Sequence, residues 1–568
     1  MKQFFTLLIA FLTLTTIQAQ VVTEVIKGDS SNANGIYITK NTTLTNTKIW
    51  ELDKFCYIQP GVTLTIEKGS LIKGKKSFKG TIVVTRGAKI VAEGTRTQPI
   101  VFTSSGAKGD RTTGDWGGII ILGRSQVNLS RTDATGNRVV GEGIIEGGVH
   151  DGISTGIFGG GAAPNLTDNS GILKFVRIEY SGIPFSANNE INGLTLGGVG
   201  SGTTIENVQV SYNGDDAFEF FGGTVNAKNL ISFANVDDDF DTDNGFNGNV
   251  QFGLAVRNPN SYDAQGASNG FESDNISGGA YAAPFTTCNF SNFTVIGPRK
   301  DMATTINSRF GAAINLKVNS RKGIFNSVFM GFNRGLRIDG AGTALAAKGD
   351  TVPFLNNIIV KSGTDAFGVS TDAAAAAAFD INAFVGAATK LNDTTKSIAD
   401  LLLNDPFNLE KPNALPKTGS PLLTGAAFAD ARLASTYFDK TVTYRGAFGA
   451  TDWTSGWANF NPDTLSYTAP ITTSSLNDLT EQGFEAKIYP NPTKNQAAVA
   501  FSIEKTMNLD IQVMDLLGRT IKNIKNQQYT EGVNQVELDM TGMAKGIYLV
   551  RFVSVADNAQ KTLTLSVL

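Results

Sequence analysis

The sequence predicts an all-β fold, a parallel β-helix followed by a small β-sandwich, and three observations lead to this prediction. Charged residues make up only 17% of the chain and glycine accounts for 62 of 568 residues, as in proteins built from strands and turns. Apolar and polar residues alternate with a period of two along many short stretches. A unit of about 22 residues also repeats in the centre of the chain.

The N-terminus has the features of a secretory signal peptide. Lys2 supplies the positive start, residues 4–14 (FFTLLIAFLTL) form the apolar core, and the stretch TTIQAQ offers a small residue for cleavage after Ala19. No later stretch reaches the roughly 18 apolar residues that a transmembrane helix needs. We therefore expect residues 1–19 to be removed and the mature chain to contain no transmembrane segment.

Residues 20–467 are assigned to the β-helix. In GVTLTIEKG, Val62, Leu64 and Ile66 alternate with polar residues, so one face of the strand is buried. The stretches 208–229 (VQVSYNGDDAFEFFGGTVNAKN) and 230–251 (LISFANVDDDFDTDNGFNGNVQ) are two copies of one unit. A lone unit cannot bury its apolar face, so we expect each copy to form one coil and the coils to stack into a rod. The residues expected to stack at one turn are Asn207, Asn229, Asn292, Asn326 and Asn357.

Two stretches depart from the strand pattern. The Ala-rich stretch 370–390 (STDAAAAAAFDINAFVGAATK) predicts a short helical insertion near 370–403, on the side of the rod or near its end. Residues 468–485 are polar and read as a linker, after which the composition changes. Residues 486–568 are assigned to a second domain.

The last 80 residues carry three short motifs: KIYPNPTKN at 487–495, VMDLLGR at 513–519 and GMAKGIYLVRF at 542–552. Alternating strands such as AAVAFSI and LDIQVMD, with glycine turns, predict a small Ig-like β-sandwich. The motifs resemble the C-terminal sorting domain of the type IX secretion system of Bacteroidetes, with a sorting motif at Tyr489, Pro490, Asn491 and Pro492. The resemblance implies the type IX machinery as a partner, transit across the outer membrane, and cleavage of this domain. The rest of the chain is then released or held at the outer cell surface.

The central region contains GDWGGIIILGRS at 114–125 and SNGFESDN at 268–275. Together with residues 189–230, these stretches resemble a group of exported bacterial right-handed β-helix proteins. The group has no established activity, so the resemblance implies a right-handed rod and contributes little about chemistry.

Carboxylates gather in three coils of the predicted rod. Stacking the coils sets Glu219 beside Asp241, and Glu272 beside Asp241 on the next rung, at a strand spacing of about 4.8 Å. Like charges this close repel one another unless water, raised pKa values or a divalent cation compensates them. Three interpretations stay open: a solvated structural edge, a Ca²⁺ site with oxygen ligands, or a catalytic site. In the stretch DFDTD, Asp239, Asp241 and Asp243 are expected to face outward. We call Glu219, Asp241 and Glu272 the acidic column. The candidate metal ligands are Asp215, Glu219, Asp237, Asp239, Asp241, Asp243, Glu272 and Asp274.

Asp216 is left out of this set. Asp216 and Phe218 recur in a later coil at 365–367, so they are assigned to the repeated turn.

Two chemistries are known for β-helix enzymes: glycoside hydrolysis by paired carboxylates and polysaccharide elimination. A single histidine, His150, excludes sites with several histidines and argues against a Ser-His-Asp triad. Gly214 to Asp216 is similar to the Asp-Asp motif of polygalacturonases, but the Gly-His-Gly of that family is missing. In a polysaccharide lyase, Ca²⁺ neutralises a uronate and a basic side chain removes the α-proton; Arg337, on or near the acidic column, is the candidate base. The alternative role of Arg337 is an ion pair with neighbouring acids.

For the tryptophans, a functional and a structural interpretation both stay open. Trp116, Trp453 and Trp457 could stack on sugar rings or close the core of the rod. Cys56 and Cys288 are far apart in the sequence and are expected to be two isolated thiols.

The expected function is therefore a secreted or cell-surface protein that binds glycan or mediates adhesion, and that is not an enzyme. The alternative is a Ca²⁺-dependent polysaccharide lyase or another carbohydrate-active enzyme. The net charge of −3 gives no reason to expect nucleic acid as a partner; an extracellular polysaccharide is the expected partner besides the secretion machinery.

Overall fold

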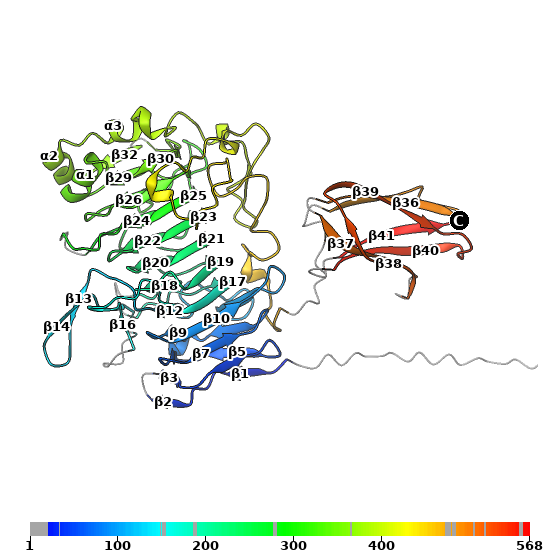
Figure 1. Ribbon diagram of the computed structural model, residues 1–568, viewed down its shortest axis with the longest axis horizontal. Helices are drawn as coiled ribbons and strands as arrows, with labels where there is room; N and C mark the ends of the chain where they lie inside the picture. Colours follow the sequence, from blue (N-terminus) through cyan, green and yellow to red (C-terminus); the bar gives the residue numbers. More distant parts are fainter. Residues whose placement is uncertain are drawn as a thin grey trace, which may run out of the picture.

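In the computed structural model, the chain forms a long parallel β-helix and an antiparallel β-sandwich (Figure 1). The structure describes residues 21–32, 35–147, 149, 155–185, 190–276, 281–363, 366–471, 479, 484–503, 506–515, 519–555 and 560–568. The expected cleavage site at Ala19 and the single histidine, His150, lie outside these residues. Both parts of the predicted fold are confirmed.

Two long sheets form the β-helix, and their strands pair in parallel except for β2 with β3. Sheet A contains β1 (Thr23–Val25), β4 (Thr42–Leu44), β5 (Ile49–Leu52), β7 (Thr63–Ile66), β8 (Leu71–Gly74), β10 (Lys89–Glu93), β11 (Ile100–Ser104), β17 (Gly171–Glu179), β19 (Thr204–Ser211), β21 (Asn226–Phe233), β23 (Asn249–Val256), β25 (Asn289–Ile296), β27 (Gly323–Phe325), β28 (Val328–Met330), β30 (Phe354–Leu355) and β31 (Ile358–Ile359). Sheet B contains β2 (Ser30–Asn32), β3 (Gly35–Ile38), β6 (Phe55–Ile58), β9 (Thr81–Val84), β12 (Ile119–Leu122), β18 (Leu194–Gly197), β20 (Phe218–Phe221), β22 (Phe240–Asp243), β24 (Phe271–Ser273), β26 (Ile314–Leu316), β29 (Leu336–Ile338) and β32 (Phe367–Val369).

The repeated unit forms one coil, as the sequence predicts. Val208 pairs with Leu230 in sheet A, and Phe218 pairs with Phe240 in sheet B. Phe218 and Phe240 are fully buried and stack with their ring centroids 5.3 Å apart. Equal coil length therefore brings identical positions of neighbouring coils together inside the rod.

The asparagines that were expected to stack at one turn mark a bend in the backbone. Asn207, Asn229, Asn292 and Asn326 all have a positive φ, between 51° and 62°, which asparagine tolerates better than most residues. Asn356, with a φ of 59°, continues this stack in place of the expected Asn357. Asn292 and Asn326 each donate a side-chain hydrogen bond to a backbone carbonyl of residues 427–444, which lie outside the coils.

The outer face of sheet A is covered by the chain segment that follows the coils. Residues 399–471 run back along the rod, and their backbone meets Asn326 at Ala427, Gln209 at Asn459 and Gly69 at Ile471. Apolar residues of this segment pack on the outward side chains of sheet A. The segment includes the hairpin β33 (Leu403–Asp405) and β34 (Asn413–Pro416). Figure 1 shows it, in yellow and orange, along one side of the rod.

An insertion covers the first coils of sheet B on the outside. It contains β13 (Ser130–Thr132), β14 (Arg138–Val140), β15 (Gly143–Ile144) and β16 (Ile157–Phe158). The outward side chains of Tyr57, Val83 and Ile120 are buried under it, against Ile145 and Phe158. Unlike the rest of the rod, the later coils of sheet B lie, in the described part of the chain, under neither residues 399–471 nor this insertion.

Three short helices lie at the C-terminal end of the rod: α1 (Ala341–Lys348), α2 (Thr371–Ala377) and α3 (Ile381–Gly386) (Figure 1). Ala344, Ile381 and Phe384 belong to the same apolar cluster as the interior of the coils, so the helices close that end of the core. α2 and α3 fall in the stretch where the sequence predicts helix; α1 was not expected. Within the described residues, no helix combines the length and apolar character needed to cross a bilayer.

The second domain is a sandwich of two antiparallel sheets around its own apolar core. One sheet contains β35 (Glu485–Tyr489), β36 (Gln496–Ile503) and β39 (Gly532–Asp539); the other contains β37 (Met507–Met514), β38 (Thr520–Tyr529), β40 (Gly546–Ser554) and β41 (Gln560–Val567). Leu479 and Phe484, inside the stretch read as a linker, are buried in this core, and Ile471 is bonded to the rod.

Candidate functional site

One column of outward side chains in sheet B changes character along the rod. In register from the first coils to the last it reads Tyr37, Tyr57, Val83, Ile120, Thr195, Glu219, Asp241, Glu272, Asn315 and Arg337. The apolar members lie under the insertion, and the acidic members follow where the insertion ends. Glu219, Asp241 and Glu272 thus occupy successive rungs, as the repeat predicts.

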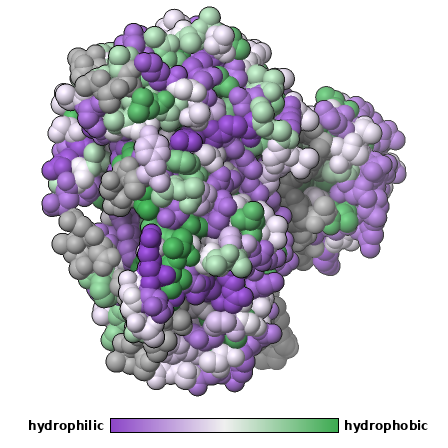
Figure 2. Space-filling view, turned by 60° about the vertical axis from the view of Figure 1, so that its left-hand side comes forward, coloured by the Kyte–Doolittle hydropathy of each residue, from purple (hydrophilic) through white to green (hydrophobic). Residues whose placement is uncertain are grey.

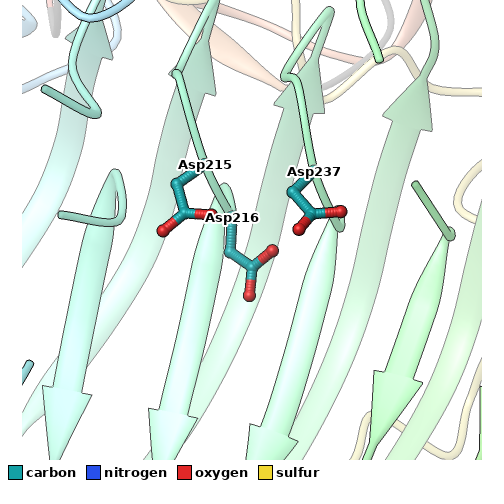
Figure 3. A group of neighbouring side chains, drawn as sticks. All are labelled: Asp215, Asp216 and Asp237. Carbon is teal, nitrogen blue, oxygen red and sulfur yellow. The ribbon is translucent and has the colours of Figure 1, made fainter. Parts of the chain in front are cut away.

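A second group of carboxylates lies at the turns that precede these strands. Figure 3 shows Asp215 and Asp216 on one turn and Asp237 on the next. One carboxylate oxygen from each of these three residues lies within 4.8 Å of the other two, and the same holds for Asp216, Glu219 and Asp241. Asp216 therefore connects the turn group with the column. The prediction that Asp216 belongs only to the repeated turn was incomplete, and it is added to the candidate ligands.

Asp216 also has a structural role in a ladder of side chains along the rod axis. Its Oδ1 accepts a hydrogen bond from the Asp238 amide at 2.8 Å, and Asp238 Oδ1 accepts one from the Asn269 amide. At the ends of the ladder, Asn192 Oδ1 accepts from the Asp216 amide and Asn269 Oδ1 from the Ala312 amide. These buried turn amides need an acceptor, which explains why Asn or Asp recurs at this position.

A cavity of about 270 Å³ opens beside the turn group, and we call it the acidic pocket. It is lined by Glu146, Glu190, Asn192, Gly214, Asp215, Asp216, Glu219, Asp237, Asp263 and Gln265. None of these described lining residues is a lysine or arginine. The sequence did not point to Glu146, Glu190 or Asp263, because they come from irregular stretches outside the repeat.

The pKa values in the pocket are raised. Burial, followed by repulsion from Glu146, holds the pKa of Asp215 well above its usual value. Burial and Glu146 act on Glu219 in the same way, and burial followed by the Asp263 charge raises the pKa of Asp237 to about 7. One oxygen of Asp237 is buried without a hydrogen-bond partner within the described residues. The group is therefore short of positive charge and of donors.

A lysine compensates the negative charge at the far end of the column. Lys317 Nζ contacts Glu272 and lies 3.5 Å from Asp274. Burial raises the pKa of Asp274 to about 7 and that of Asp243 to about 6, and Lys317 opposes both shifts. Asp243, Glu272 and Asp274 thus lie around a cation that the chain itself supplies.

Asp239 was expected to face outward, and this was wrong. It is fully buried, and its Oδ1 lies 3.2 Å from Nη1 of Arg257, which is itself buried. It also accepts a hydrogen bond from Ser232 Oγ. The strict alternation begins only at Phe240, where β22 starts, so extending it back by one residue placed Asp239 on the wrong side.

The other candidate residues are dispersed. Arg337 is on the column two rungs beyond Glu272, and its Nη2 lies 2.7 Å from Asp339 Oδ2. Trp116 and Trp457 are buried, at 1% exposure each, and belong to the core. Trp453 is partly buried and stacks on Phe448.

Cys56 and Cys288 are buried free thiols, as expected. In the sorting motif, Tyr489 ends β35, its hydroxyl donates to Gln535, and Asn491 donates to the Thr564 carbonyl. Pro490 and Pro492 follow Tyr489 and Asn491 through cis peptide bonds.

Comparison with known proteins places both domains. Residues 487–566 match the secretion system C-terminal sorting domain, so the chain is addressed to the cell surface or the extracellular space. No curated protein matches the chain. A solved structure, the enzymatically active domain of tailspike protein 2 of bacteriophage CBA120, aligns with 91% of this chain and 72% of its own at 10% identity, with a TM-score of only 0.23. Residues 36–399, which include the acidic pocket, match the pectate-lyase-like β-helix domain, and the chain belongs to this family.

Proposed function

We propose that the exported rod is a non-catalytic binding protein that holds Ca²⁺ in the acidic pocket and binds an extracellular glycan on the outer face of sheet B. The observation that carries the proposal is the pocket itself, where carboxylates from neighbouring turns converge. Ca²⁺ takes six to eight oxygen ligands, and carboxylates on adjacent coils offer such a set.

Charge supports a cation here in preference to a solvated edge. Asp216 and Glu219 are buried, at 8% and 7% exposure, where water compensates charge poorly. Within the described residues, no arginine or lysine forms an ion pair with Asp215, Asp216, Glu219 or Asp237, in contrast to Lys317 at the far end. Protonation or a divalent cation can relieve the repulsion, and exported proteins meet Ca²⁺ outside the cell.

The polarity of the same face supports the proposed glycan binding. The carboxylates and the exposed side-chain amide of Gln265 accept and donate hydrogen bonds in the way that sugar hydroxyls require. Figure 2 shows hydrophilic residues over much of this side of the rod, with smaller hydrophobic areas between them. A bound Ca²⁺ would add a charge that attracts acidic glycans.

The alternative function is elimination by a Ca²⁺-dependent polysaccharide lyase with Arg337 as the base. Its support is the register, since Arg337 lies on the acidic column. It ranks second because none of the described residues that line the acidic pocket is basic, and because Arg337 is paired with Asp339.

The test is calorimetry of the chain from residue 20 onward with CaCl₂, followed by a glycan screen with Ca²⁺ or with a chelator. We expect Ca²⁺ binding, and glycan binding that weakens with chelator. The double variant Asp215→Asn/Asp237→Asn should lose Ca²⁺ affinity by at least about tenfold, since it removes two charged ligands. Glu93→Gln, an exposed acid on β10, is the matched control.

Two outcomes would contradict the proposal. Equal Ca²⁺ affinity in the double variant would remove the metal site, and the absence of any retained glycan would remove the binding function. Release of unsaturated uronate ends that is lost in Arg337→Ala would instead establish the lyase.

A further inference from the structure

We infer that a second pocket on the rod binds the anionic group of an acidic sugar. This cavity, the arginine pocket, has a volume of about 550 Å³ and lies at the turns after β6, β9 and β12. It is lined by Gln59, Pro60, Thr85, Arg86, Arg124, Thr155, Gly160, Ala163, Asn165 and Asp168, and among the described residues it shares none with the acidic pocket. Its size falls in the range of small-molecule sites, about 300–1,000 Å³.

Two donors of the pocket are left without partners. The Arg124 guanidinium makes no hydrogen bond or ion pair with the residues that the structure describes. It lies directly against the backbone of Gly87, where an added Cβ would come within 2.6 Å of Nη2. The Gln59 side-chain nitrogen is buried and also lacks a partner within the described part of the chain. A buried amide without an acceptor is costly, so a ligand oxygen at this point would be stabilising.

The charges around the pocket favour an anion. Arg86 Nη1 and Arg131 Nε each donate to Glu142, at 2.7 Å, so two guanidinium groups share one carboxylate. Asp168 Oδ2 accepts from the Arg124 amide and from Ser170 Oγ. With Arg124 included, the guanidinium groups outnumber these carboxylates by one. A guanidinium fork binds a carboxylate or sulfate through two parallel hydrogen bonds.

The remaining lining suits a sugar ring as the carrier of that anion. Asn165 offers an exposed amide group, whereas Pro60 and Ala163 offer small apolar surfaces for C–H groups. A uronic acid or a sulfated sugar presents this combination; a free inorganic anion uses only the guanidinium. The inference extends the proposed glycan binding to a second site and names the chemical class of the glycan.

The experiment titrates the chain from residue 20 onward with sodium galacturonate, sodium glucuronate, a glucose sulfate, neutral galactose and inorganic phosphate. We expect at least one acidic sugar to bind about tenfold or more tightly than galactose. Comparing the carboxylated and sulfated sugars identifies which anionic group the pocket prefers. Binding of phosphate as tight as that of every acidic sugar would overturn the assignment to a sugar.

Variants locate the site. Arg124→Ala should weaken acidic-sugar binding by about tenfold or more, Arg124→Lys should restore part of it, and Gln59→Leu should weaken it severalfold. Arg138→Ala removes an exposed arginine on β14, in the insertion that also contributes to the pocket, and should leave acidic-sugar affinity unchanged. Arg124 is exposed, so its variants should keep the melting temperature of the parent chain.

The outcomes separate this inference from the proposed function. Unchanged affinity in Arg124→Ala, or no binding of any acidic sugar, would overturn the arginine pocket whether or not the glycan screen succeeds. The variant Asp215→Asn/Asp237→Asn should leave acidic-sugar binding intact, because both residues line the acidic pocket and neither lines the arginine pocket.

Discussion

At the scale of single residues, Asp216 combines a structural hydrogen bond with a charge that the fold does not neutralise. The ladder needs an acceptor at this turn, and Asn192 and Asn269 supply a neutral one at equivalent positions. Asp216 accepts the same kind of bond but adds a carboxylate to Asp215 and Asp237. The choice of Asp over Asn therefore contributes nothing to the ladder, whereas it adds a ligand to the proposed Ca²⁺ site.

Two substitutions of Asp216 separate these roles. Asp216→Asn keeps an oxygen for the Asp238 amide and removes one charge, so the cation-free chain should be as stable or more stable, while Ca²⁺ affinity falls. Asp216→Ala leaves the amide unpaired and should lower the free energy of unfolding by about 1–3 kcal/mol. Denaturant unfolding and Ca²⁺ calorimetry measure both. A cation-free Asp216→Asn chain that is much less stable than the parent would contradict the assignment.

At the scale of elements, the coil is the unit that the sequence predicts well. The register of Glu219 with Asp241 follows from two coils of equal length, and the alternation in β20 and β22 assigns each side chain to a face. Insertions carry no such periodicity, so neither the position of Glu146 nor the arginine pocket could be predicted from the sequence. Asp239 was misplaced because its partner, Arg257, follows β23 and only the stacked coils bring the two together.

The Arg257–Asp239 pair fastens the acidic turn to the rod. Arg257 Nη1 also donates to the Asp237 carbonyl and Nη2 to the Val236 carbonyl. Arg257→Met should therefore destabilise the rod by roughly 3–5 kcal/mol, because it leaves the Asp239 carboxylate buried without a partner.

The double variant Arg257→Met/Asp239→Asn tests the mechanism. It removes both charges and should recover part of the stability in denaturant unfolding. A double variant no more stable than Arg257→Met would show that the lost packing and carbonyl bonds, and not the stranded charge, cause the loss.

At the scale of the whole molecule, the coverings determine which face is available. Residues 399–471 occupy the outside of sheet A, and the insertion occupies the first coils of sheet B. The acidic column follows directly on the apolar part of the same register column. Both pockets lie next to the insertion, which supplies Glu146 to one and Gly160 and Ala163 to the other.

The sorting domain should be dispensable for the rod and required for its destination. It has its own core, so deletion of residues 486–568 should leave Ca²⁺ binding unchanged. In a cell with the type IX machinery, the truncated chain should stay in the periplasm, as fractionation and immunoblotting would show. Truncated chain at the surface in normal amounts would contradict the role of this domain.

The stability of the cation-free chain should fall as the pH rises. The pKa of Asp237 is about 7 in the folded rod, because burial and Asp263 disfavour its charge, whereas an unfolded aspartate titrates near 3.9. Between these values the folded state holds a proton that the unfolded state has lost, so raising the pH favours unfolding until about pH 7. Asp274, also raised to about 7, and Asp243, raised to about 6, act in the same direction.

Saturating Ca²⁺ should weaken this dependence, because it binds the deprotonated carboxylates of the acidic pocket and replaces their protons. Asp243 and Asp274 do not belong to the described lining of that pocket and should keep their smaller contribution. The measurement is the melting temperature of the rod from pH 5 to 7.5, with chelator and with Ca²⁺. It stops at pH 7.5 because burial lowers the pKa of Lys322 to about 8, which adds an opposite trend above that point. Asp215→Asn/Asp237→Asn should flatten the chelator curve, since it removes titrating carboxylates. A melting temperature in chelator that rises over this range would show that the acidic pocket is not the repulsive cluster described, and the case for a cation would fall with it.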